Sequence, residues 1–129
     1  MINREEKYVN KNVALLLKEL GDVNFNCDFS IDDVDYPTLW DVQKWLRDEC
    51  HFEIMIEYDG NTGFSGEKEK LYTPMYMQAY TPTGFEEYDD SNCWIEISQF
   101  HNYEDALNAA LEKCIKILID EKNFNEDDL

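Results

Sequence analysis

The segment YEDALNAALEKCIKILI, residues 103–119, carries the pattern that decides the fold. Its apolar residues recur at helical spacing, which predicts a helix with one broad buried face. That face comprises Ala106, Leu107, Ala109, Ala110, Leu111, Cys114, Ile115, Leu118 and Ile119. Asn102 is the predicted N-cap, and Asp105 follows three residues later. Because alanine is small, we expect this helix to lie close against a sheet.

Segments that alternate apolar and polar residues predict the strands of that sheet. His51–Tyr58, Leu71–Tyr80 and Cys93–Ser98 give three strands, and Val23–Ile31 gives another strand earlier in the chain. Pro74 lies inside the second of the three. Since proline cannot donate to a ladder, we expect that strand to be an edge or to bulge there.

Two further helices precede the three strands. Arg4–Leu20 has apolar residues at helical spacing, and Gly21 is a predicted C-cap. The next helix has Thr38 as its predicted N-cap, Asp41 as a partial capping-box partner and an apolar stripe that reaches Cys50.

Residues 1–129 are therefore predicted to form a single α+β domain of α-β-α-β-β-β-α order, with residues 123–129 as a frayed acidic tail. We expect an antiparallel sheet of three to four strands with helices mainly on one face. The last five elements have the order of double-stranded-RNA-binding domains. Glu104 and Asp105 stand where such a domain needs a basic start to its last helix, so RNA binding is not expected.

The charge of the chain restricts its partners. Asp and Glu number 29, Lys and Arg number 11, and the net charge is −18. Nucleic-acid binding depends largely on Lys and Arg, and anionic membranes attract basic segments, so neither partner is expected. A strongly acidic protein stays soluble and monomeric and meets basic partners quickly.

The cysteines and the apolar runs indicate a cytoplasmic protein. Cys27, Cys50, Cys93 and Cys114 form no C-x-x-C pair, and no secretory leader or membrane-length apolar run is present. We therefore expect small core cysteines rather than a disulfide framework.

Metal and catalytic motifs are incomplete. Asp59–Gly63 is similar to the start of an EF-hand calcium loop, but Phe64 and Lys70 occupy the positions that need Gly and Glu. Cys50-His51 is too small a cluster for zinc without ligands from elsewhere in the chain.

A second acidic cluster, formed by Asp28, Asp32, Asp33 and Asp35, is interpreted as a solvated stretch, with weak cation binding as the alternative. The sequence has no G-x-S-x-G elbow and no glycine-rich phosphate loop after a strand. No catalytic residue, metal or cofactor is therefore predicted, and the chain is not expected to be an enzyme.

A contact surface is the functional prediction. If the helices cover the face with Phe52, Ile54, Ile56, Ile95 and Ile97, and Met75, Met77 and Ala79 also point inward, the other face is rich in aromatic and acidic residues. Its predicted contact residues are Tyr72, Tyr76, Tyr80, Trp94, Glu53, Glu57 and Glu96. Aromatic side chains anchor protein interfaces. The alternative is that the strand near Phe25, or the first helix, covers this face.

Three segments, Tyr36–Leu39, Gln43–Arg47 and Tyr103–Leu107, also carry a family resemblance. Together they resemble short proteins of Bacteroides-type gut bacteria, their phages and mobile elements, over about Val13 to Ile119. In that group a Y-P-x-P-T segment leads into a Q-K-W-L-R helix, and a Y-E-E-A-L-type helix closes the chain. This chain lacks the first proline of that motif. The resemblance implies a phage-like or mobile-element setting and carries no activity with it.

We therefore predict a small non-enzymatic interaction protein that binds a protein partner. The alternative is a DNA mimic that inhibits a nucleic-acid-binding enzyme through ordered carboxylates. Mimicry predicts rows of carboxylates at phosphate spacing and binding that salt abolishes. An aromatic interface predicts that Tyr76→Ala or Trp94→Ala weakens binding more than salt does.

Overall fold

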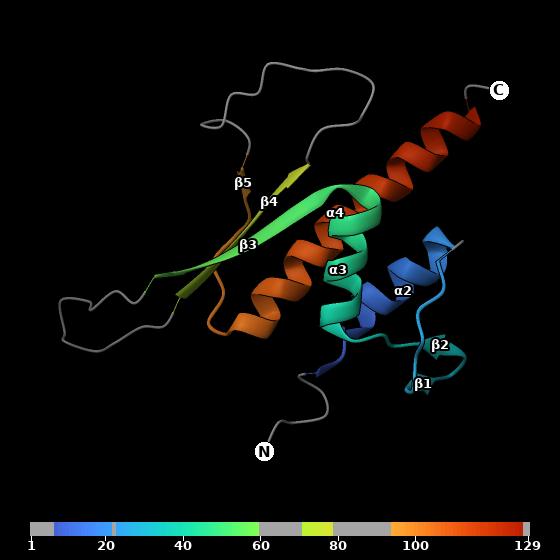
Figure 1. Cartoon of the computed structure of the whole chain (residues 1–129), viewed down its shortest axis with the longest axis horizontal. Coiled ribbons are helices and arrows are strands. Elements are labelled where there is room, and N and C mark those ends of the chain that lie inside the picture. The colour runs from blue at the N-terminus through green and yellow to red at the C-terminus, as the bar shows by residue number, and fades with distance from the viewer. Residues whose placement is uncertain (1–6, 22, 60–70, 79–93, 128–129) are drawn as a thin grey trace.

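The computed structural model describes residues 7–21, 23–59, 71–78 and 94–127. Over these residues the chain is an α+β protein with three helices, a two-stranded and a three-stranded antiparallel sheet (Figure 1). The elements are α2 (Lys11–Leu20), β1 (Ser30–Ile31), β2 (Val34–Asp35), α3 (Leu39–Cys50), β3 (Phe52–Asp59), β4 (Leu71–Gln78), β5 (Ile95–Glu96) and α4 (Tyr103–Asp127).

The long helix α4 is the element on which the others pack. It contacts β3 and β4 of the larger sheet, and it also contacts α2 and α3 (Figure 1). Ala106 and Ala110 are fully buried on it, as are Leu111 and Ile115. The small and large side chains of this face confirm the predicted close packing between α4 and the sheet.

The hydrophobic core lies between α4, the other two helices and one face of the sheet. Its largest fully buried side chains include Phe52 from β3, Leu46 from α3 and Val13 from α2. Each such side chain contributes about 1.5–3 kcal/mol by leaving water. The core therefore joins elements that are far apart in the sequence.

Two polar side chains of α4 hold α2 at both of its ends. The Asn108 Oδ1 accepts a hydrogen bond from the backbone N–H of Asn10 at 2.8 Å, and its Nδ2 donates to the Glu104 carbonyl at 2.9 Å. At the other end the Lys122 Nζ donates to the Leu20 carbonyl at 2.8 Å. A cation at this end of α2 also complements the helix dipole. The two helices thus lie parallel, start beside start and end beside end.

Helix α2 is shorter than predicted. The predicted span was Arg4–Leu20, but the helix begins at Lys11 because the side chain of Asn10 caps it. Tyr8 instead forms an antiparallel bridge with Thr38. The start of the predicted span lies outside the described residues.

The predicted end of α2 is confirmed. The Gly21 N–H donates to the Leu17 carbonyl at 3.1 Å, and Gly21 has φ 68° and ψ −176°. That backbone region is open essentially to glycine alone, which explains why the chain has glycine at this position.

The predicted strand Val23–Ile31 is mostly not a strand. Only Ser30–Ile31 pairs, and its partner is Val34–Asp35. The connecting residues Asp32 and Asp33 have positive φ angles of 52° and 64°, as a two-residue type I′ hairpin turn requires. Aspartate tolerates this conformation better than most residues do, so the turn itself accounts for two members of the acidic cluster.

Burial alternates along this segment although most of it has no strand partner. Val23, Phe25, Cys27 and Phe29 are half-buried, and the residues between them are exposed. The sequence pattern therefore reported one-sided burial correctly, and the prediction of a fourth sheet strand from it was wrong.

The predicted caps of α3 and α4 are confirmed. The Thr38 Oγ1 accepts from the Asp41 N–H at 3.1 Å, and the Asn102 Oδ1 accepts from the Asp105 N–H at 2.7 Å. A reciprocal contact follows at α4, where the Asn102 Nδ2 donates to the Asp105 carboxylate at 2.8 Å. Both helices thus start where their local sequence signals place them.

The C-terminal end of α4 differs from the prediction. The predicted apolar face ended at Ile119, and the helix continues through Asp127, so residues 123–127 are helical. Within the described part of the chain, no helix combines the length and the apolar character needed to cross a membrane.

Pro74 does not mark an edge strand, because β4 is the middle strand of the order β3-β4-β5. The Pro74 carbonyl accepts from the Ile97 N–H at 2.9 Å, so the missing proline N–H faces β5. On that side Tyr72 pairs with Phe100 and Met75 with Glu96. Three steps along β4 thus face four steps along the other chain, and this extra residue is the predicted bulge.

Substitution of Asn108 tests the attachment of α2. Asn108→Ala removes a buried side chain and the acceptor of the Asn10 N–H, and we expect the free energy of unfolding to fall by about 1–3 kcal/mol. Urea unfolding followed by circular dichroism measures it. Asn12→Ala, an exposed change on α2 itself, serves as the control and should shift the free energy by no more than about 0.5 kcal/mol. Equal effects of the two changes would show that Asn108 does not hold α2.

Candidate functional site

The strand register decides which side chains share a face of the larger sheet. Ile54 pairs directly with Tyr76, and directly paired residues point to the same face. Phe52 and Tyr76 are buried in the core, 0% and 5% exposed, and their rings lie 6.3 Å apart. The face that bears them is therefore the face that the helices cover.

This register corrects the predicted contact surface. Tyr76 lies under the helices and not on the open face. Tyr72 shares that side, where its ring lies 5.1 Å from the Tyr58 ring and 6.0 Å from the Tyr103 ring. Tyr80 lies outside the described residues.

The same correction applies to the residues predicted to point inward. Met75 and Met77 pair with Met55 and Glu53, so they lie on the face opposite the helices. Ala79 lies outside the described residues. Ile95 pairs with Tyr76 but is 50% exposed, so it does not join the core as predicted.

We call the opposite side of the sheet the methionine–glutamate face. It is defined by Glu53, Met55, Glu57, Met75, Met77 and Glu96 from the strand register, with Trp94 beside Glu96 by alternation. Three of the predicted contact residues lie on it in the strand register: Glu53, Glu57 and Glu96. Alternation along the chain before β5 puts Trp94 on the same side. Its exposed apolar side chains are Met55 at 43% and Trp94 at 36%. Met75, on the middle strand, is buried at 5%.

Neither of the coverings considered for this face is observed. The Phe25 ring packs edge-on against Trp45 of α3 at 5.7 Å. Helix α2 packs on α4, which lies on the other side of the sheet. Both elements therefore belong to the helical layer.

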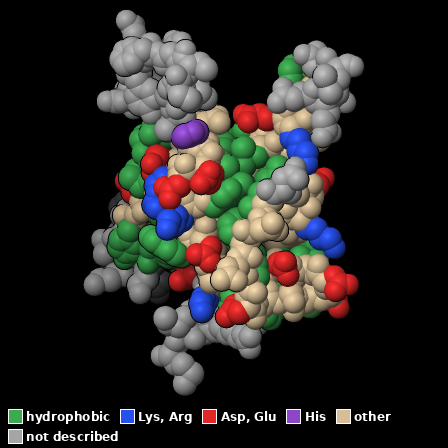
Figure 2. Space-filling view, turned by 45° about the vertical axis from the view of Figure 1, so that its right-hand side comes forward, with side chains coloured by type: hydrophobic (Ala, Val, Ile, Leu, Met, Phe, Trp, Pro, Cys, Tyr) green, Lys and Arg blue, Asp and Glu red, His purple; other side chains and the backbone are tan. Residues whose placement is uncertain are grey.

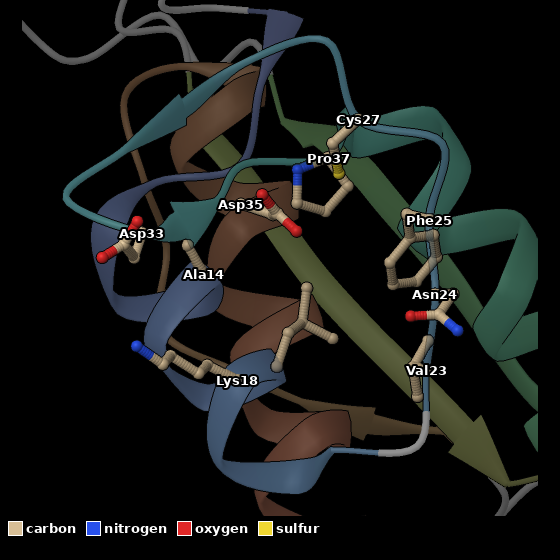
Figure 3. Close-up of a pocket in the computed structure, with 10 residues that line it drawn as sticks. Ala14, Lys18, Val23, Asn24, Phe25, Cys27, Asp33, Asp35 and Pro37 are labelled. Carbon is tan, nitrogen blue, oxygen red and sulfur yellow. The ribbon is translucent and has the colours of Figure 1, made fainter.

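A small pocket lies between α2 and the extended segment after it (Figure 3). Figure 3 shows Ala14 and Lys18 on α2 across from Val23, Asn24 and Phe25. Its volume is about 120 Å³, below the roughly 300–1,000 Å³ of typical ligand pockets. The remaining lining residues are Leu17, Cys27, Asp33, Asp35 and Pro37.

The thiol in this pocket is not activated. Burial raises the pKa of Cys27, and the carboxylates of Asp35, Asp41 and Asp28 raise it further. Nucleophilic cysteines need the opposite, a pKa lowered by cations or a helix start. The pocket therefore offers no reactive thiolate at neutral pH.

A second hollow of about 320 Å³ lies on the other side of the same segment, against α3. Phe25 and Trp45 form its aromatic wall, and Asp41, Asp48 and Glu49 make it acidic. Its shape is open and shallow, and Lys44 lies among the carboxylates.

Three members of the acidic cluster of the hairpin have roles in local structure. Asp28 accepts a hydrogen bond from the Tyr8 hydroxyl at 2.9 Å, and Asp32 and Asp33 form the turn. Throughout residues 7–21, 23–59, 71–78 and 94–127, no three His, Cys, Asp or Glu side chains are grouped so as to hold a metal ion. The segment after Asp59 that is similar to a calcium loop lies outside these ranges, and so does Cys93.

Two other cysteines, Cys50 on α3 and Cys114 on α4, lie close enough to interact electrostatically. Burial raises the pKa of Cys114 to about 12, and the neighbouring Cys50 contributes to the rise. Burial also raises the pKa of Cys50 to about 11, with Glu49 and Glu121 adding to it. Cys27, Cys50 and Cys114 are free thiols. The core interpretation is confirmed for the fully buried Cys114, while Cys27 and Cys50 are half-buried.

Comparisons with protein-family models, with curated proteins and with solved structures give no match.

The raised thiol pKa values predict a loss of stability at alkaline pH. Below pH 9 the thiols are protonated in both the folded and the unfolded chain. Above pH 9 the unfolded chain loses these protons, while the folded chain keeps that of Cys114 up to about pH 12. The free energy of unfolding therefore falls as pH rises, with a limiting slope for Cys114 of about 1.4 kcal/mol per pH unit.

Urea unfolding at several alkaline pH values, under reducing conditions, measures this slope. Cys114→Ala should flatten it, although the variant is less stable at every pH. Ile115→Val, which trims a neighbouring core side chain, should lower stability and keep the slope. A slope that Cys114→Ala leaves unchanged would contradict the assignment.

Proposed function

We propose that this protein binds a protein partner through the methionine–glutamate face, and that the partner presents basic residues around an apolar anchor. The observation that carries the proposal is the placement of the exposed Met55 among Glu53, Glu57 and Glu96 on the side of the sheet opposite the helices. Alternation adds the exposed Trp94 to the same side.

The apolar part of this face suits an adaptable contact. Met55 pairs directly with Met75 across the two strands, and Met77 follows on the same face. Methionine is flexible and polarisable, which lets such surfaces fit differing apolar partners. Exposed apolar side chains that gather within a polar rim are typical of interaction sites.

The charged part of this face selects the sign of the partner. Glu57 and Glu96 are exposed and Glu53 is half-buried. The whole chain adds a net charge of −18, which speeds the encounter with a basic partner. Complementary charge contributes mainly to association rate and specificity, while the apolar anchor contributes to the lifetime of the complex.

The DNA-mimic alternative rests on the net charge. On the side of the molecule shown in Figure 2, Asp and Glu side chains are interspersed with Lys and Arg and with apolar side chains. A mimic of a phosphate backbone needs carboxylates in regular rows. On that side of the molecule, the mixed surface favours the contact-face proposal over mimicry.

The order of the elements bears on whether the partner is a protein or RNA. The order α3-β3-β4-β5-α4 is similar to that of double-stranded-RNA-binding domains, but Glu104 and Asp105 lie in the first turn of α4. We therefore propose a protein and not RNA as the partner. We place the protein in the cytoplasm and propose that it derives from a phage or a mobile element. Its proposed role is binding without catalysis.

Peptide selection tests this proposal. We expect peptides selected on the immobilised protein from a random displayed library to combine Lys or Arg with apolar residues. Met55→Lys should weaken their binding at least about tenfold, since it replaces an apolar contact and opposes the basic partner. Titration calorimetry with the synthetic peptides measures the affinity.

The matched control is Leu15→Lys on α2. Leu15 and Met55 are both 43% exposed, and both changes alter the net charge equally. Leu15→Lys should therefore keep the affinity within about twofold. The proposal fails if the two variants bind alike, or if Leu15→Lys shows the larger loss.

Salt distinguishes the alternative. Raising the salt from about 0.1 M to about 1 M shortens the Debye length from about 10 Å to about 3 Å. The contact face predicts a weakened but persistent complex. Complete loss of binding in high salt, with Met55→Lys without effect, would favour the mimic.

A further inference from the structure

Strand β3 forms one edge of the three-stranded sheet. It runs over the eight residues Phe52–Asp59 and pairs with β4 along its whole length. The other side of β3 has no neighbouring strand in the described chain. Edge strands carry a row of backbone donors and acceptors that can bind a further strand.

The hydrogen bonds of β4 show which backbone groups of β3 form this row. Tyr72 exchanges both backbone hydrogen bonds with Phe100, at 2.7 and 2.9 Å, so its N–H and C=O face β5. Backbone groups alternate in direction along a strand, and those of Met75 therefore face β3. Met55 is the partner of Met75, and its backbone groups face back toward β4.

The residues on either side of Met55 therefore point their backbone groups away from β4. These are Ile54 and Ile56. Among the described residues, none bonds to the outward N–H and C=O groups of these two isoleucines. The edge thus offers donors and acceptors at alternate residues in the middle of β3.

We infer that the edge of β3 binds an extended basic segment of the partner, which adds to the sheet as an antiparallel fourth strand. The inference rests on the proposed function and specifies the conformation of the partner. Binding at the β3 edge and binding at the methionine–glutamate face would then be one contact, because a strand beside β3 continues that face.

The side chains of β3 set the sequence that such a strand needs. Directly opposed side chains in antiparallel strands lie about 4.5–5.5 Å apart. Lys or Arg opposite Glu53 and Glu57 forms ion pairs on the open face, and an apolar residue opposite Met55 fills the space between them. Residues opposite Ile54 and Ile56 lie on the helix side, where both isoleucines are half-buried, and are apolar. The expected pattern is therefore basic, three apolar residues, basic.

A second copy of this chain is the less favourable occupant. Two β3 strands that pair in an antiparallel register centred on Met55 place Glu53 of each copy opposite Glu57 of the other. Like charges in directly opposed positions are destabilising. Each copy also carries a net charge of −18, which opposes association further.

Amide hydrogen exchange by NMR tests the inference, with a synthetic peptide that has Lys-Val-Leu-Val-Lys at its centre. On binding, we expect slower exchange of the Ile54 and Ile56 amides, because they gain hydrogen bonds. The Met55 and Glu57 amides already face β4 and should change little. This alternation is a control within the chain, since a bound peptide that only covers the face would not produce it.

Two methylated peptides provide the matched comparison. In the inferred register the two valines donate their backbone N–H groups to β3, and the N–H of the leucine points away. N-methylation of the valines should weaken binding by about tenfold or more, because it removes these donors. N-methylation of the leucine should change the affinity by less than about threefold.

The outcomes separate this inference from the proposed function. Binding without protection of Ile54 and Ile56, or equal losses from the two methylated peptides, overturns strand addition and leaves the contact face in place. Failure of the unmethylated peptide to bind overturns strand addition too, while the selected peptides and Met55→Lys still decide the contact face. Protection that appears without peptide as the protein concentration rises would identify a second copy as the occupant.

Discussion

The burial of one face of α4 is the constraint on which the rest of the structure depends. Leu107, Leu111, Cys114 and Ile115 are almost fully removed from water, and this face contacts both other described helices and two strands of the sheet. Local propensity does not account for such a helix, since packing of an apolar face supplies most of the stability of protein helices. The polar ends of the same helix then fix α2, because Asn108 and Lys122 provide the hydrogen bonds that the start and end of α2 need.

This arrangement leaves the sheet with two unlike faces. The helices cover one face completely enough to bury Phe52 and Tyr76. The other face has a buried methionine in its middle strand and exposed methionine, tryptophan and glutamate side chains around it. Within the described residues, all three helices lie on the side of Phe52 and Tyr76, and none covers the methionine–glutamate face. The mixture of Met55 with Glu53 and Glu57 on this face is the basis of the proposed contact with a basic partner.

The sequence predicted those features that depend on neighbouring residues. The caps at Thr38 and Asn102 and the glycine end of α2 are local signals, and each was found. The register of β4 is different, because it depends on how two strands pair across a long connection. Both faces of β4 are apolar, with Met75 and Met77 on one and Tyr72 and Tyr76 on the other. Alternation alone could not choose between them, and a shift by one residue moves every side chain to the other face. For the same reason the alternating Val23–Ile31 segment predicted a strand, although only its last two residues are paired.

The negative charge of Glu53 and Glu57 on β3 affects two kinds of strand pairing, with a second copy and with a basic partner. A long edge strand with unpaired backbone groups promotes association between copies, and natural proteins oppose this with charged side chains, prolines or bulges. Here Pro74 and the bulge lie on the β5 side of the sheet, so they do nothing to protect the β3 edge. In an antiparallel pair of two copies centred on Met55, Glu53 of each β3 would lie opposite Glu57 of the other and repel it. The repulsion is specific to sign, since the same carboxylates attract a strand that carries Lys or Arg at matching positions. Under the proposed strand addition, the charge that opposes pairing between two copies is therefore the same charge that attracts the partner strand.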